Sequence, residues 1–143
     1  LNLLKRFRRK VPEYMINIKK QIEYWRSGAL EDWQVGNELI GRNRIRHGLF
    51  FIHLAIEKIL KANVCRKTND IAPPIHNLTR LAERAGLQLT EEQENVLAEA
   101  NEFNIEGRYP ELLLPVPTLE EVNNFMVRSE EVFKWLTKLL EHP

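Results

Sequence analysis

Residues 42–47 read Arg-Asn-Arg-Ile-Arg-His and place three arginines and a histidine within six positions. Such a cluster could hold a phosphate group while His47 transfers a proton, which is the arrangement that a metal-independent ribonuclease needs. Arg42 and His47 would be the catalytic residues of that enzyme. The alternative is an exposed, solvated helix start. Position favours this alternative, because cations at a helix N-terminus oppose the macrodipole and do not form a pocket alone.

A second set of candidate residues is spread along the chain and combines basic side chains with one carboxylate and one tyrosine: His53, Glu57, Lys58, Lys61, His76, Arg108 and Tyr109. One interpretation is a cationic groove that binds a nucleotide or phosphates. The structural interpretation is that Glu57 pairs with Arg108 or a lysine, while the lysines extend to the surface. We favour the structural interpretation, since long charged side chains rarely stay buried except in pairs. Arg108 is the expected partner because a guanidinium can satisfy both carboxylate oxygens.

Other kinds of chemistry have weaker support in the sequence. His53 and Glu57 are one helical turn apart, but no second pair of ligands has such spacing, so we expect no metal and no cofactor. Gly41 and Gly48 are too far apart to form a phosphate-binding loop. Neither a serine nor the single cysteine, Cys65, lies in a sequence motif typical of a catalytic nucleophile. A catalytic triad assembled from distant parts of the chain would show no such motif.

The composition fits one soluble domain of 143 residues, with 43% hydrophobic and 29% charged residues. A formal net charge of +1 produces no global field that would favour nucleic acid or an acidic membrane. The single cysteine rules out an internal disulfide and fits a reducing, cytoplasmic location. No apolar run approaches the roughly 20 residues that span a bilayer, so we expect no membrane association.

Residues 1–11 form a basic flank, which contains five cations within its first ten positions: Lys5, Arg6, Arg8, Arg9 and Lys10. A solvated flank is the favoured interpretation. A nucleic-acid or membrane-surface arm, or the end of a signal, are the alternatives, and the apolar content is too short for a signal core. The remaining residues, 12–143, are expected to form one domain.

Apolar periodicity predicts helices throughout that domain. A helix of about 28 residues should run from Pro12 to about Gly41, where Gly28 and Gly36 either weaken it or allow a bend or close packing. A short turn after Gly41 should make the next helix antiparallel to this one. That helix contains residues 48–62, the densest apolar run, and should end near Cys65. Because it is apolar over most of its circumference, it should lie at the centre of the fold.

The rest of the chain predicts a loop and three further helices. A loop over residues 66–75 should precede a short helix from His76 to Gly86. Residues 90–93 and 118–121 are capping boxes that should start the last two helices. The expected fold is therefore all-α: an antiparallel up-down-up-down four-helix bundle with one short additional helix.

A homodimer is expected on two grounds. The central helix has more apolar circumference than its neighbours in a small bundle can cover. The last helix offers a second apolar stripe through Phe125, Val132 and Leu139. Surplus apolar surface of this kind is typical of interfaces.

Several of these segments together resemble the HEPN domain, the higher eukaryotes and prokaryotes nucleotide-binding family. The most specific is the helix containing LFFIHLAIEKILKA. It is accompanied by residues 74–78 (PIHNL), residues 107–110 (GRYP) and the pattern of Trp25, Ala29, Asp32, Trp33 and Leu39. The resemblance covers roughly residues 14–140. It implies an antiparallel helical bundle, usually a homodimer, and commonly a partner that is a minimal nucleotidyltransferase.

Many catalytic HEPN proteins are ribonucleases with an arginine and a histidine separated by four to six residues late in the bundle. Here the late arginine is Arg108, and no histidine follows at that spacing. Arg42 and His47 have the spacing but precede the central helix. The chain therefore resembles the non-ribonuclease branch, which is suspected of binding nucleotides, and we expect that it is not an enzyme. Three functions stay open: a dimeric module for a nucleotide or a nucleotidyltransferase, a toxin-type ribonuclease that acts on RNA, and a structural dimerisation domain.

Overall fold

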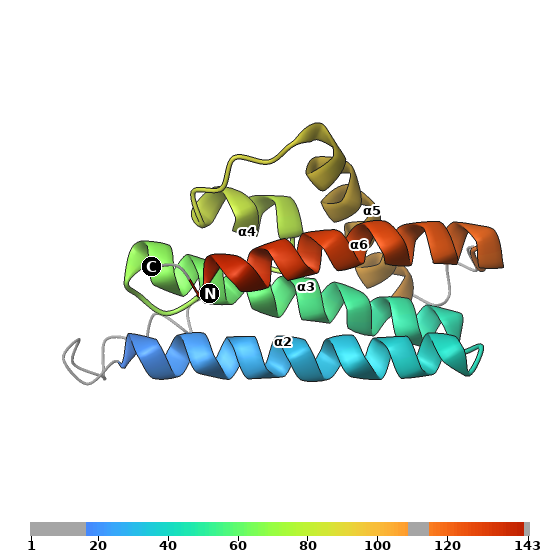
Figure 1. Cartoon of the computed structure of the whole chain (residues 1–143), viewed down its shortest axis with the longest axis horizontal. Helices are drawn as coiled ribbons and strands as arrows, with labels where there is room; N and C mark the ends of the chain where they lie inside the picture. Colours follow the sequence, from blue (N-terminus) through green and yellow to red (C-terminus); the bar gives the residue numbers. More distant parts are fainter. Residues whose placement is uncertain (1–16, 109–114, 142–143) are drawn as a thin grey trace.

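The computed structural model describes residues 17–108 and 115–141, and for residues 105–108 it describes the backbone only. Within these ranges the chain is helical and contains no strand. The helices are α2 (Ile18–Gly41), α3 (Ile45–Thr68), α4 (Leu78–Arg84), α5 (Glu91–Arg108) and α6 (Leu119–Leu139) (Figure 1). The expectation of an all-α fold is confirmed for the described residues. None of these helices is long and apolar enough to cross a membrane.

Helix α3 is the central element of the fold. It contacts α2, α4, α5 and α6, and Leu49, Ile52, Ile56, Ile59 and Leu60 along it are at most 1% exposed. Figure 1 shows α2 and α3 running in opposite directions, with α6 running along α3 in the direction of α3. The predicted central position of residues 48–62 is confirmed. The stricter up-down-up-down bundle stays a prediction, since α5 runs at a steep angle to α3 in this view.

Helix boundaries differ from the predicted ones where polar side chains cap the backbone. Helix α2 begins at Ile18, because Asn17 is extended (φ −95°, ψ 100°) and its side chain accepts a hydrogen bond from Lys20 N at 3.0 Å. The prediction of one continuous helix from Pro12 is therefore wrong, and Pro12 itself lies outside the described residues. Helix α4 begins at Leu78 rather than His76, because Asn77 is its N-cap and accepts from Arg80 N.

Helix α3 continues past Cys65 to Thr68. Arg66 and Lys67 occupy its last turn, where cations interact favourably with the helix dipole. Asn69 then adopts a left-handed conformation (φ 53°) and its N–H donates to Cys65 O, which ends the helix. The predicted end near Cys65 was thus too early by about one turn.

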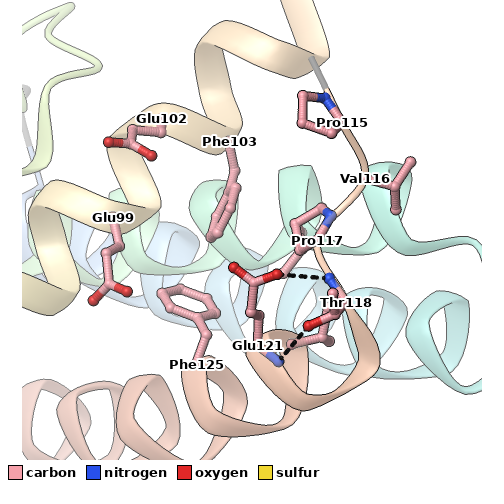
Figure 2. A pocket seen from close by; sticks show the side chains of 11 residues that line it. Glu99, Glu102, Phe103, Pro115, Val116, Pro117, Thr118, Glu121 and Phe125 are labelled. Atoms are coloured by element: carbon pink, nitrogen blue, oxygen red, sulfur yellow. Dashed lines mark hydrogen bonds between the residues drawn. The ribbon is translucent and has the colours of Figure 1, made fainter.

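Both predicted capping boxes are present. Thr90 N donates to Gln93 Oε1 at 2.9 Å, and Gln93 N donates to Thr90 Oγ1 at 3.1 Å. Thr118 N and Glu121 N make the same reciprocal pair of bonds at the start of α6, drawn as dashed lines in Figure 2. These bonds satisfy N–H groups that a helix start would otherwise leave without partners.

Helices α2 and α3 approach each other closely at two glycines. A Cβ atom on Gly48 would lie 2.5 Å from Ile40 Cγ1 and 2.9 Å from the carbonyl oxygen of Gly36. A Cβ on Gly36 would lie 2.7 Å from Ile52 Cδ1. Of the alternatives for Gly36, close packing is therefore the one that the structure shows. Gly28 is less constrained, because a Cβ there would meet only the Lys58 side chain, at 3.2 Å.

The second apolar stripe expected on α6 does not face outward. Phe125 and Val132 are only 3% and 4% exposed. Phe125 packs edge-on against Phe103 of α5 at 4.9 Å between ring centroids (Figure 2), and Leu139 packs against the core. This argument for a dimer is therefore wrong. The apolar residues of α3 that are only half-buried are Ile45, Phe50, Phe51 and Leu54.

Cys65 provides a test of the core around α3. Its thiol is fully buried, and burial raises its pKa to about 11 from the ordinary 9.0. We expect a thiol reagent at pH 8 to leave Cys65 unmodified in the folded protein and to modify it fully in guanidinium, as measured by release of thionitrobenzoate. Since the unfolded thiol ionises near 9.0, folding stability should also fall as pH rises above that value. Rapid stoichiometric modification of the folded protein would contradict this.

Candidate functional site: a buried carboxylate cluster on α3

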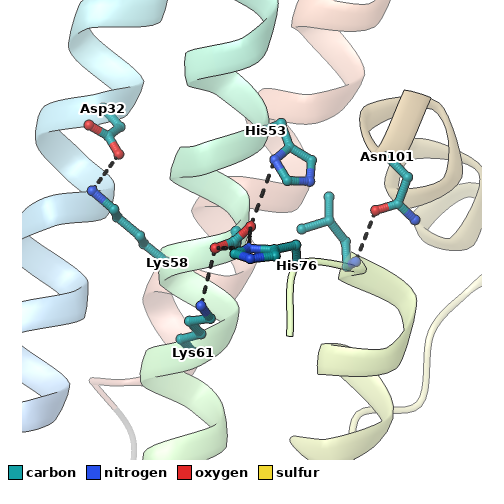
Figure 3. A network of polar contacts seen from close by, with 8 residues as sticks. Asp32, His53, Lys58, Lys61, His76 and Asn101 are labelled. Atoms are coloured by element: carbon teal, nitrogen blue, oxygen red, sulfur yellow. Dashed lines mark hydrogen bonds and ion pairs between the residues drawn. The ribbon is translucent and has the colours of Figure 1, made fainter. Parts of the chain in front are cut away.

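Glu57 lies at the centre of a polar cluster inside an apolar fold. Its side chain is only 6% exposed. One oxygen accepts a hydrogen bond from Lys61 Nζ at 3.2 Å, and His76 Nδ1 lies 3.1 and 3.2 Å from the two oxygens (Figure 3). The His53 Nδ1 atom is 3.9 Å from Glu57 Oε1. An ionised carboxylate only accepts hydrogen bonds, so the His76 nitrogen that faces it carries the proton.

The members of this cluster, called here the Glu57 cluster, come from two segments. His53, Glu57 and Lys61 succeed one another at four-residue steps on α3 and therefore share one face of the helix. His76 comes from the loop before α4. That loop is fixed by its neighbour, since Leu78 N donates to Asn101 Oδ1 of α5 at 2.9 Å (Figure 3).

Access to the Glu57 cluster is through His76. Its side chain is 51% exposed, whereas that of Lys61 is 7% exposed and that of His53 is fully buried. With Nδ1 directed at Glu57, the other ring nitrogen, Nε2, has no assigned partner among the described residues. An external group that reached the cluster would therefore meet the imidazole of His76 first.

Lys61 is buried rather than extended to the surface, contrary to the structural interpretation of the lysines. Its ammonium group lies 5.0 Å from the centroid of the Trp25 ring, in cation–π geometry, in addition to its bond to Glu57. These two contacts replace the hydrogen bonds to water that a lysine at the surface would make. The expectation that Glu57 pairs with a lysine is correct. The contribution of Trp25 was missed, because helical spacing does not show which residues of another helix lie opposite.

Lys58 belongs to a different pair. Its Nζ lies 2.7 Å from Oδ2 of Asp32 on α2, and the Asp32 residue is buried (Figure 3). This ion pair joins α2 to α3 beside Gly28, whose missing side chain leaves room for the lysine stem. Lys58 therefore has a carboxylate partner of its own and is not part of the Glu57 cluster.

The expected pairing of Arg108 with Glu57 is not tested. The backbone of Arg108 ends α5, but its side chain and the whole of Tyr109 lie outside the described residues. The described partners of Glu57 are His76, Lys61 and His53. A role for Arg108 or Tyr109 at this site stays a prediction.

Arg42 and His47 lie at the turn between α2 and α3, and both are exposed. Arg42 is the C-cap of α2, and His47 is in the first turn of α3. No hydrogen bond or ion pair joins the two side chains in the described structure. Ten helical residues, or about 15 Å, separate His47 from Glu57 along α3. The structure therefore does not bring this pair together with the Glu57 cluster.

A cavity of about 400 Å³ lies between α5, α6 and the segment that leads into α6 (Figure 2). Its apolar lining includes Leu49, Phe103 and Phe125, whereas its polar lining includes Glu99, Glu102 and Glu121. Carboxylates repel phosphates, so this cavity, called here the acidic cavity, does not suit a nucleotide. Over the described ranges, no group of three or more histidine, cysteine, aspartate or glutamate side chains could hold a metal ion.

These observations define an all-helical domain whose central helix holds a buried, histidine-linked carboxylate. The sequence matches the model of the HEPN domain over residues 22–140. The chain therefore belongs to the HEPN family, as its sequence segments suggested. No curated protein and no solved structure is significantly similar to it.

Proposed function

We propose that this HEPN chain is a dimeric binding module in which the Glu57 cluster holds a phosphate group of a nucleotide, in partnership with a nucleotidyltransferase. The observation that carries the proposal is that His76 and Lys61 converge on Glu57 from two segments, while the His76 side chain stays 51% exposed. Imidazole N–H groups and ammonium groups both donate hydrogen bonds to phosphate oxygens. The nucleotidyltransferase partner is what the resemblance to the family's non-ribonuclease branch implies.

The Glu57 cluster supports binding better than catalysis. Lys61 and His76 contact a carboxylate and an aromatic ring, and no hydroxyl or thiol group is among their described partners. Lys61 is nearly enclosed, so a phosphate would contact His76 directly and Lys61 only at its edge. Half-buried Phe50, Phe51 and Leu54 on α3 leave apolar surface that supports the dimer.

Titration of ATP into the protein by calorimetry tests the nucleotide site. We expect His76→Ala to weaken ATP binding by about tenfold or more, because it removes a charged hydrogen bond worth about 1.5–3 kcal/mol. His47→Ala removes the same side chain about 15 Å away along α3 and should bind like wild type. No binding by wild type, or equal binding by His76→Ala, would contradict the proposal.

The His47→Ala variant also decides the ribonuclease alternative. We expect no cleavage of a labelled single-stranded RNA by wild type. Cleavage that is lost in His47→Ala would establish a ribonuclease that uses Arg42 and His47.

A further inference from the structure

The acidic cavity combines an apolar interior with an unbalanced negative rim. Leu49, Phe103, Val122 and Phe125 form the apolar part. On the rim, Glu99 is neutralised by Arg128, whose Nη2 atom lies 2.6 Å from Glu99 Oε2. Such a surface should bind a segment that carries cations beside apolar side chains.

Two rim carboxylates have no cationic partner among the described residues. Glu121 Oε1 accepts a hydrogen bond from Thr118 N at 3.0 Å, and this bond lowers the pKa of Glu121, which keeps it ionised. Glu102 is exposed and takes part in no ion pair that the described structure contains. The rim therefore keeps a surplus of negative charge that a cationic occupant would neutralise.

One segment of this chain has the complementary composition. Residues 1–10 (LNLLKRFRRK) hold Leu3, Leu4 and Phe7 among five cations. We propose that this basic segment of one copy docks in the acidic cavity of a second copy. Its apolar side chains contact Phe103 and Phe125, and its cations face Glu102 and Glu121. In a two-fold symmetric dimer, the basic segment of each copy docks in the cavity of the other copy, so the contact occurs twice.

Chain length favours the second copy over the same copy. Gly48, which precedes the cavity residue Leu49, packs against Ile40, about 33 Å along α2 from Ile18. Arg9 is eight residues before Asn17, so its backbone reaches at most about 29 Å from the start of α2. Helix α3 also stands between α2 and the cavity. The backbone of Arg9 and Lys10 therefore falls short of the Leu49 side of the cavity in their own copy, whereas a partner's cavity imposes no such limit.

This inference rests on the dimer in the proposed function, but not on nucleotide binding. Sedimentation equilibrium should show a dimer that weakens as salt increases. Glu102→Lys and Arg9→Glu should each weaken dimerisation by about tenfold or more, and the double variant should largely restore it. Glu31→Lys makes the same charge change on an exposed position of α2 and should dimerise like wild type.

Carbodiimide cross-linking of a mixture of ¹⁴N- and ¹⁵N-labelled chains provides a second measurement. We expect cross-links between Lys5 or Lys10 and Glu102 in peptides that combine both isotopes. A monomer in sedimentation would overturn both this inference and the dimer. A dimer that Glu102→Lys and Arg9→Glu leave unchanged, or cross-links formed only within one copy, would overturn this inference alone and leave the dimer standing.

Discussion

Gly48→Ala should destabilise the protein strongly although it adds a single methyl group. The new Cβ would lie 2.9 Å from the carbonyl oxygen of Gly36, so α2 and α3 would have to separate. Overpacking of this kind costs about 1–3 kcal/mol, and a backbone neighbour places this site at the upper end. Thermal unfolding monitored by circular dichroism should show a melting temperature lower by several degrees.

Gly41→Ala is the matched control for this substitution. Nothing lies within 4 Å of a Cβ at Gly41, which is the last residue of α2. Its stability should stay within about 1 kcal/mol of wild type, since only the helix propensity changes. Equal melting temperatures for Gly48→Ala and wild type would show that the two helices are not in close contact at this point.

Glu57→Gln should cost about 3–5 kcal/mol of folding free energy, because it leaves the buried ammonium group of Lys61 without its counter-charge. Glu130→Gln is the control: it changes the same atoms in an exposed pair with Lys134 and should leave the unfolding midpoint unchanged. Chemical denaturation followed by circular dichroism measures both.

A double-mutant cycle separates this pair from a general effect on α3. Glu57→Gln combined with Lys61→Met removes both charges, so the double variant should be more stable than the sum of the single effects predicts. Additive losses would mean that Lys61 and Glu57 do not interact in solution. Full stability of Glu57→Gln would mean that the carboxylate is not buried.

Local sequence patterns predicted the elements of the fold well. The capping residues Thr90 and Thr118 satisfy neighbouring N–H groups, so they mark helix starts in the sequence itself. The apolar circumference of residues 48–62 likewise placed α3 at the centre. The N-caps Asn17 and Asn77 are harder to recognise in the sequence, although asparagine is a common N-cap, because Pro12 and His76 nearby also suit a helix start.

Contacts between elements were predicted less well, because they depend on how helices rotate against one another. The face shared by His53, Glu57 and Lys61 follows from spacing, but spacing does not show that Trp25 of α2 contacts Lys61 or that Asp32 of α2 pairs with Lys58. The direction of Phe125 and Val132 also depends on α5, whose Phe103 covers one of them. Periodicity shows that a helix has an apolar stripe, but not whether this chain or another covers it.

The short length of α4 has a consequence for the order in which parts of this domain open. Seven residues are far fewer than a helix needs to persist by itself, so α4 exists only while α3 and α5 hold it. His76 lies two residues before α4, and the Leu78–Asn101 bond is at the helix start. Local unfolding of α4 would release His76 from Glu57 without disturbing the pairing of α2 with α3. The cluster is thus attached to a segment whose helical order depends on the burial of Leu78 and Leu81 and on its packing against α3 and α5.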